Sequence, residues 1–171
     1  MRAAAFSLIS IAPMALPSDA RLEDALPGGG RALVGKDTLV MAAQNGYGNY
    51  ETVAAAIGKE HALLARVIFG VKLPAPGRAE VTVIADDVRM GQPDNAVDPE
   101  RVKAIAAAIN GAGIPTSYAA NVAAILWDKI LYNAALNPLG AVLECTYGRL
   151  AENPGTRQVM DRIIDEIFQV A

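Results

Sequence analysis

Two short apolar segments, each followed by a stretch with helical signals, limit what the first sixty residues of this chain can fold into. Residues 6–11 and 38–43 are apolar runs of the kind that form buried strands. Residues 18–26 and 50–57 have the composition of helices, and Gly58 is a stop signal for the second. The order strand, helix, strand, helix predicts a parallel α/β sheet.

The middle of the chain has the pattern of strands joined by hairpins. Residues 63–72 are apolar with β-branched and aromatic members, and residues 79–84 alternate behind a Pro/Gly turn. Residues 88–91 form a further short strand after a turn at Asp86 and Asp87, and residues 116–119 are a candidate edge strand. We therefore expect a β segment before the chain becomes helical.

Helices dominate the last third. Asp98 and Pro99 are a typical N-cap and first helical residue. A long helix is expected over residues 122–136, where Pro138 should kink or interrupt it. Asn153 starts a final helix, whose inward-facing residues are expected to be Val159, Ile163, Ile164 and Ile167. The predicted organisation is an α/β part, a β insert and the beginning of an all-helical part.

Composition excludes several classes of function. With 171 residues and 53% hydrophobic residues, the chain can bury a sizeable core. A net charge of −3 without a basic stripe argues against nucleic acid and membrane surfaces as partners, and no stretch is long and apolar enough to span a bilayer. The single Cys145 and single His61 exclude a disulfide framework, a cysteine- or histidine-rich metal site and Ser-His-Asp catalysis.

The N-terminus allows two interpretations. Arg2 is followed by an apolar run from Ala3 to Leu16 and then by small residues, which is the outline of a secretory signal peptide. The alternative is that residues 6–11 are a buried strand leading into a loop. From the residues alone the two weigh about equally.

The loop between the second strand and its helix, residues 44–49, is a first candidate site. It reads Gln-Asn-Gly-Tyr-Gly-Asn and lies where open α/β sheets bind ligands. Gly46 and Gly48 allow the backbone to approach a ligand closely, and the Asn45 amide both donates and accepts. The alternative is a tight turn, for which Asn and Gly are also suited, and Glu51 stands where a phosphate-binding loop would have its third glycine.

A polar stripe on the long helix is the stronger candidate. Lys129, Asn133 and Asn137 recur every four residues and share one face of an otherwise apolar helix. A solvent-facing stripe usually carries Glu, Lys and Arg, whereas Asn is a poor helix former. We therefore favour a polar cleft over an exposed stripe. A lysine there can bind a carboxylate or donate a proton to a keto oxygen.

These motifs resemble the ketopantoate reductase family. The similarity rests on Gln-Asn-Gly after a strand and on the later pattern Asn-Val-x4-Trp-x-Lys-x3-Asn-x3-Asn-Pro-Leu, and it covers roughly residues 22–171. It implies NADPH-dependent reduction of ketopantoate (2-dehydropantoate) to pantoate, in pantothenate and coenzyme A biosynthesis. It also implies a partial Rossmann-like domain over residues 1–120 and the first part of a helical substrate and dimerisation domain over residues 121–171.

The resemblance assigns roles to the candidate residues. Lys129 matches the family's catalytic lysine, the proton donor to the keto oxygen, and Asn133 and Asn137 match amides that bind substrate. Asn45 matches the loop asparagine near the nicotinamide and substrate, and Gly46 is its cofactor-binding neighbour. The resemblance further implies a cytoplasmic protein, a strand over residues 6–11 and a possible homodimer.

The sequence also departs from the family pattern. It has no GxGxxG motif and no first βαβ unit, and the family's distal serine and glutamate are absent. We therefore expect a piece of a reductase with impaired or no activity alone. The alternatives are a non-catalytic binding or dimerisation remnant, a reductase of another 2-keto acid, and an unrelated exported α/β protein that binds a sugar or an acid.

Overall fold

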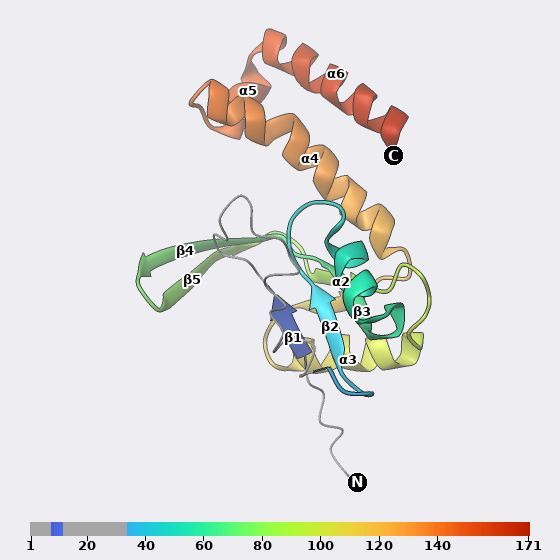
Figure 1. Cartoon of the computed structure of the whole chain (residues 1–171). Helices are drawn as coiled ribbons and strands as arrows, with labels where there is room; N and C mark the ends of the chain where they lie inside the picture. Colours follow the sequence, from blue (N-terminus) through green and yellow to red (C-terminus); the bar gives the residue numbers. More distant parts are fainter. Residues whose placement is uncertain (1–7, 12–33) are drawn as a thin grey trace. The chain divides into compact units, whose positions relative to one another are not determined.

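The computed structural model describes residues 8–11 and 34–171 and divides the chain into two compact units, Met1–Ala123 and Ala124–Ala171. The described part of the first unit is α/β, with a five-stranded sheet and a separate two-stranded hairpin, and the second unit is helical (Figure 1). The predicted fold class is therefore confirmed. The helix predicted at residues 18–26 lies outside the described residues.

The five-stranded sheet has the order β1-β2-β3-β6-β7. Its strands are β1 (Leu8–Ile11), β2 (Leu39–Ala42), β3 (Ala62–Arg66), β6 (Val88–Gly91) and β7 (Thr116–Tyr118). The first three are parallel, and β6 runs antiparallel to β3 and parallel to β7. The strands predicted near residues 6–11, 38–43 and 88–91 and the edge strand are confirmed.

Helices cover both faces of this sheet (Figure 1). On one face, alternate strand residues such as Met41, Leu63 and Met90 pack with Val102 and Ile105 of α3 (Pro99–Gly111) into the core. The other residues of each strand point to the opposite face, because side chains alternate along a strand. There α2 (Asn49–Ile57) contacts β2 and β3.

The hairpin is formed by β4 (Phe69–Ala75) and β5 (Arg78–Ile84), which pair antiparallel. The apolar run at residues 63–72 was expected as one segment, but it divides between β3 and β4. Every hairpin residue beyond Gly70 is exposed, including five large apolar side chains: Val71, Leu73, Val81, Val83 and Ile84.

The long helix α4 (Val122–Val142) begins in the first unit and continues through the second, where α5 (Tyr147–Glu152) and α6 (Pro154–Val170) follow. Of the two outcomes expected at Pro138, a kink or an interruption, the interruption does not occur, because hydrogen bonds resume beyond Pro138, as from Leu143 N–H to the Leu139 carbonyl at 2.9 Å. Gly148 lies inside α5. Val159 is exposed and does not face inward.

Two predicted helix starts are confirmed in detail. The Asp98 carboxylate accepts the Glu100 N–H at 3.0 Å, and the Asn153 side chain accepts the Gly155 N–H at 2.8 Å. His61 is half-buried in a 3-10 turn (Lys59–His61), and its Nδ1 lies 2.8 Å from the Thr38 carbonyl. Within the described ranges, no helix meets the length and apolarity that a membrane span requires.

Candidate functional site

The loop from Gln44 to Asn49 leaves the carboxyl end of β2, at the edge where parallel sheets bind ligands. Gly46 and Gly48 have φ of 92° and 93°, in the left-handed region that glycine adopts without strain. A Cβ at either position would meet nothing within 4 Å, so the backbone borders open space. Asn45 is exposed beside them.

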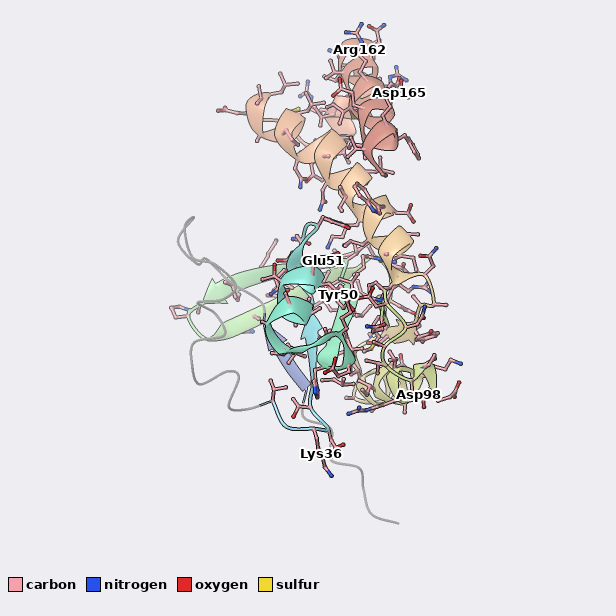
Figure 2. All side chains as sticks on the ribbon, turned by 45° about the vertical axis from the view of Figure 1, so that its right-hand side comes forward. Lys36, Tyr50, Glu51, Asp98, Arg162 and Asp165 are labelled. Carbon is pink, nitrogen blue, oxygen red and sulfur yellow. The ribbon has the colours of Figure 1, made fainter. Side chains whose placement is uncertain are left out.

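Residues of α2 hold the loop in place through hydrogen bonds to its carbonyl groups. Asn49 Nδ2 donates to the Asn45 carbonyl at 3.0 Å, and the Thr52 hydroxyl and N–H both donate to the Gly48 carbonyl, at 2.8 and 3.0 Å. Gly48 is the N-cap residue of α2 and supplies no side-chain cap, so first-turn N–H groups keep their capacity for a ligand. Glu51 lies in the same turn, beside Tyr50, and disfavours an anion there (Figure 2).

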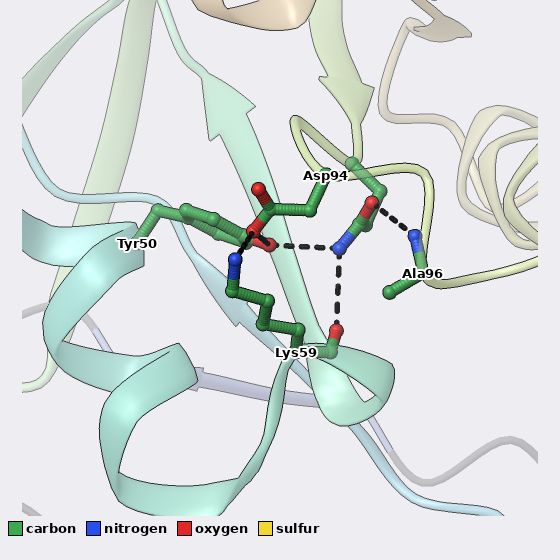
Figure 3. A network of polar contacts seen from close by, with 5 residues as sticks. Tyr50, Lys59, Asp94 and Ala96 are labelled. Atoms are coloured by element: carbon green, nitrogen blue, oxygen red, sulfur yellow. Dashed lines mark hydrogen bonds and ion pairs between the residues drawn. The ribbon is translucent and has the colours of Figure 1, made fainter.

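A polar network behind the loop fixes the start of α2 (Figure 3). The buried Gln92 donates to the Tyr50 hydroxyl at 2.7 Å and to the Lys59 carbonyl at 3.2 Å, and it accepts from Ala96 N–H at 2.8 Å. The Tyr50 hydroxyl donates to Asp94 at 3.0 Å, and Lys59 pairs with the same carboxylate at 3.2 Å. The network ties α2 to the segment after β6.

Ionisation in this network follows from its contacts. Burial, followed by the hydrogen bond to Asp94, raises the pKa of Tyr50 well above its ordinary value, so this hydroxyl stays protonated. The hydrogen bonds from Lys59 and Tyr50 lower the pKa of Asp94. The group is therefore a structural support with a neutral phenol and a charged ion pair.

A second cluster of polar side chains, which the sequence did not predict, joins neighbouring strands β3 and β6 of the sheet. Arg66 donates to Asp86 Oδ2 at 2.5 Å, and Arg89 donates to Asp86 Oδ1 at 3.3 Å. Asp86, interpreted above as part of a turn, thus bridges two arginines. The hydrogen bond from Arg66, ahead of all other causes, lowers the pKa of Asp86 to about 2. The sequence feature that pointed to this cluster was Arg66, a charged residue inside the apolar run at residues 63–72.

The three residues of the predicted stripe, Lys129, Asn133 and Asn137, all lie on the uninterrupted helix α4. Lys129 and Asn133 are half-buried and Asn137 is exposed. Asn137 Oδ1 accepts the Tyr147 hydroxyl at 2.5 Å, and the Tyr147 ring meets Tyr132 edge-on at 6.1 Å between centroids. The helix therefore presents this stripe within the second unit, whereas Asn45 and Gly46 belong to the first.

A pocket in the second unit lies where α4 ends and α6 begins, and Leu143, Arg149 and Thr156 are among its lining residues. None of the three stripe residues lines it. In the described residues, no group of three or more His, Cys, Asp or Glu side chains is placed to hold a metal ion.

Sequence comparison identifies relatives for both units. Residues 17–95 match the family model "Ketopantoate reductase PanE/ApbA", and residues 121–171 match "Ketopantoate reductase PanE/ApbA C terminal". The chain is 51% identical over 140 residues to the 2-dehydropantoate 2-reductase of Aquifex aeolicus (strain VF5), which covers 82% of this chain and 45% of that relative. The chain thus spans about half the length of the curated relatives it matches.

Solved structures share the fold. A D-mandelate dehydrogenase in a ternary complex with NADH and anilino(oxo)acetate superposes with a TM-score of 0.80 at 19% identity, over 95% of this chain and 50% of that one. A dimeric ketopantoate reductase from Staphylococcus aureus has a TM-score of 0.71 at 22% identity, over 95% and 51%. At these identities the similarity concerns the fold alone.

Proposed function

Since this chain belongs to the ketopantoate reductase family, we propose that its two candidate site regions serve the reduction of 2-dehydropantoate (ketopantoate) to pantoate, an oxidoreductase reaction with NADPH as donor. The observation that carries the proposal is the stripe of Lys129, Asn133 and Asn137 on one unbroken helix, within the residues that match the family's C-terminal model.

The loop residues suit one end of a dinucleotide. The open space beside Gly46 and Gly48 lets a flat ring approach the backbone, and the exposed Asn45 amide can bind a carboxamide. When bound, NADPH supplies the hydride that reduces the keto carbon. The chain's own part at this loop is to hold and orient, with α2 kept in place by the Tyr50 network.

Lys129 is assigned the proton transfer. Its ammonium would donate a proton to the keto oxygen as negative charge develops there, which is general acid catalysis. Asn133 and Asn137 would hold the substrate's hydroxyl and carboxylate oxygens. The Tyr147 hydroxyl fixes the orientation of the Asn137 amide by occupying its Oδ1, so Nδ2 is the atom assigned to a substrate oxygen.

The test uses a chimera of this chain and the Aquifex aeolicus relative. This chain supplies the segment over which the two sequences match, and the relative supplies the remainder of its own sequence. The chimera should oxidise NADPH when ketopantoate is added, and Lys129→Met should lower kcat by about 100-fold or more. Lys72→Met, which removes one charge from the exposed hairpin, is the matched control and should leave kcat unchanged. A Lys129→Met chimera with full activity would remove the lysine from the mechanism.

A second candidate is a binding or dimerisation unit without turnover. The 171-residue chain assayed alone distinguishes the two: NADPH oxidation supports the reductase, and its absence alongside an active chimera supports the second. A panel of 2-keto acids offered to the chimera identifies the substrate, since a better substrate than ketopantoate would replace it in the proposal.

A homodimer and a cytoplasmic location complete the proposal. The pairing of β1 with β2 in the sheet supports a strand at Leu8–Ile11 over a signal peptide. Sedimentation across a range of concentrations tests the dimer. Sequencing of the mature N-terminus tests the location, and a start near Arg21 would contradict it.

A further inference from the structure

Every buried side-chain polar atom without a partner in the described part of the chain belongs to one of four residues. The atoms are Gln44 Nε2 and Oε1, Arg66 Nη1, Arg89 Nε and Ser117 Oγ. Buried polar groups in folded proteins are nearly always hydrogen-bonded, so a group of exceptions at one place calls for an explanation.

The sheet brings the four residues into one row. Arg89 of β6 pairs with Arg66 of β3 on one side and with Ser117 of β7 on the other. Ala42, the last residue of β2, pairs with Leu64, and Gln44 follows Ala42 by two residues at the start of the loop, as Arg66 follows Leu64 by two residues in β3. Directly paired residues point to the same face. We call Gln44, Arg66, Arg89 and Ser117 the polar row.

The polar row lies on the face that α2 covers. Its neighbours in sequence, Ala65 and Met90 among them, belong to the core on the α3 face, so the row points the other way. Two residues beyond Arg89, the space over Gly91 on the row's face is filled by Val122 and the Ala119 carbonyl. The row is therefore bounded by apolar and backbone atoms on that side. It reaches solvent at Arg89 and Asp86, whose side chains are 36% and 38% exposed.

The charge balance of this group is positive. Asp86 accepts from Arg66, from Arg89 and from the Asp87 N–H, so its carboxylate is already occupied. Two guanidinium groups against one carboxylate leave one net positive charge, and the Arg66 side chain is only 7% exposed. Since Arg66 is paired with Asp86, the excess charge lies at the partly exposed Arg89, where an anion arriving from solvent can balance it. Four of the five unpartnered atoms are hydrogen-bond donors or can act as donors.

We propose that the polar row is a binding site for a small carboxylate, held by Arg66 Nη1 and Arg89 Nε and completed by Ser117 Oγ and Gln44 Nε2. Guanidinium groups match the planar geometry of a carboxylate, and one monoanion balances the charge. The bound carboxylate can be one of two kinds. It is either the carboxylate of the 2-keto acid substrate or its product, or that of an unrelated small molecule. The site itself does not depend on the proposed reaction.

The test follows the Arg89 Nε–H resonance of the full 171-residue chain by NMR while sodium acetate is added, with sodium chloride at equal ionic strength as reference. The resonance should move downfield and saturate with acetate, and it should stay in place with chloride. Arg66→Met should abolish the saturable shift, and Ser117→Ala should weaken acetate binding about 2- to 10-fold. Lys72→Met removes an equal charge from the exposed hairpin and should bind acetate as the wild type does.

The outcomes separate the sources and can overturn the site. Pantoate binding about tenfold more tightly than acetate assigns the site to the reaction's own carboxylate, and equal affinity assigns it to an independent carboxylate. Phosphate binding more tightly than either would overturn the assignment to carboxylates. An equal response to chloride, no response, or an unchanged affinity in Ser117→Ala would overturn the site, even if Arg66→Met fails to fold.

Discussion

At the scale of single residues, Asp86 and Tyr50 show how a polar group inside the sheet region obtains its properties from distant parts of the chain. Asp86 follows the hairpin and meets Arg66, which precedes it. Tyr50 on α2 meets Asp94 after β6. The Arg66 guanidinium stabilises the charged form of Asp86, whereas burial and the carboxylate of Asp94 stabilise the neutral form of Tyr50.

The Asp86 carboxyl should titrate with a pKa of about 2, below its ordinary value of 3.8. Because the folded-state pKa is the lower one, this carboxylate stabilises the fold above the unfolded-state value, and its contribution is lost as pH falls from there through the folded-state value. Arg66→Met should raise the pKa more than Arg89→Gln does, since Arg66 makes the shorter contact. Carboxyl-detected NMR titration measures all three proteins, and equal pKa values would show that the arginines are not the cause.

Tyr50→Phe should destabilise the first unit by about 1 kcal/mol, because it removes a buried hydroxyl that joins Gln92 to Asp94. Urea unfolding followed by circular dichroism measures the change. Tyr118→Phe is the control, since the ring that Lys103 approaches at 5.4 Å is retained. A loss in the control as large as in Tyr50→Phe would assign the effect to the substitution type and not to the network.

At the scale of elements, the turn into α2 depends on backbone that only glycine adopts easily. Gly48 is the N-cap residue of α2 with φ 93° and ψ −14°, and Gly46 has a similar φ. Left-handed backbone is costly for residues with a Cβ, independent of how much space surrounds it. The loop is therefore built for close approach to the backbone, and its shape is sensitive to substitution.

Gly48→Ala should lower the free energy of unfolding by about 1–2 kcal/mol, the usual cost of the left-handed region. Gly148→Ala is the matched control, because Gly148 lies in helix α5 with open space around it, and alanine favours helix. Thermal unfolding of both variants gives the comparison. If Gly48→Ala is as stable as the wild type, the loop does not keep this conformation in solution.

At the scale of the whole molecule, burial is unevenly distributed. The central strands β2 and β3 are buried at every residue. The hairpin of β4 and β5 exposes nearly all of its length, and α6 has no buried residue. Regions with few buried contacts open most easily, so stability should fall from the sheet toward these elements.

Hydrogen exchange should show this gradient directly. Amides of β2 and β3 should exchange slowest, and those of β4 and β5 should exchange much faster, although both pairs are hydrogen-bonded. Exchange followed by mass spectrometry at two protein concentrations is the measurement. Hairpin protection equal to that of the sheet would contradict the prediction, and protection that rises with concentration would show that a second copy covers the hairpin.

The sequence by itself determined features that depend on near neighbours. Helix starts at Asp98 and Asn153 follow from cap residues within two positions of the N–H they accept, and the stripe from Lys129 to Asn137 follows from helical periodicity. At Pro138 the sequence allowed a kink or an interruption, and only the structure shows that the helix continues past the missing N–H.

Only the tertiary structure decided the polar row and the Tyr50 network. Strand register fixes which side chains meet, and it is set by pairing between segments that are distant in sequence. Arg66 and Arg89 are separated by the hairpin, and Arg89 and Ser117 are separated by α3. His61 meets the Thr38 carbonyl for the same reason, since β2 and β3 are neighbours in the sheet. Periodicity predicts which face of an element is apolar, but partners across a sheet become known only when the strands are paired.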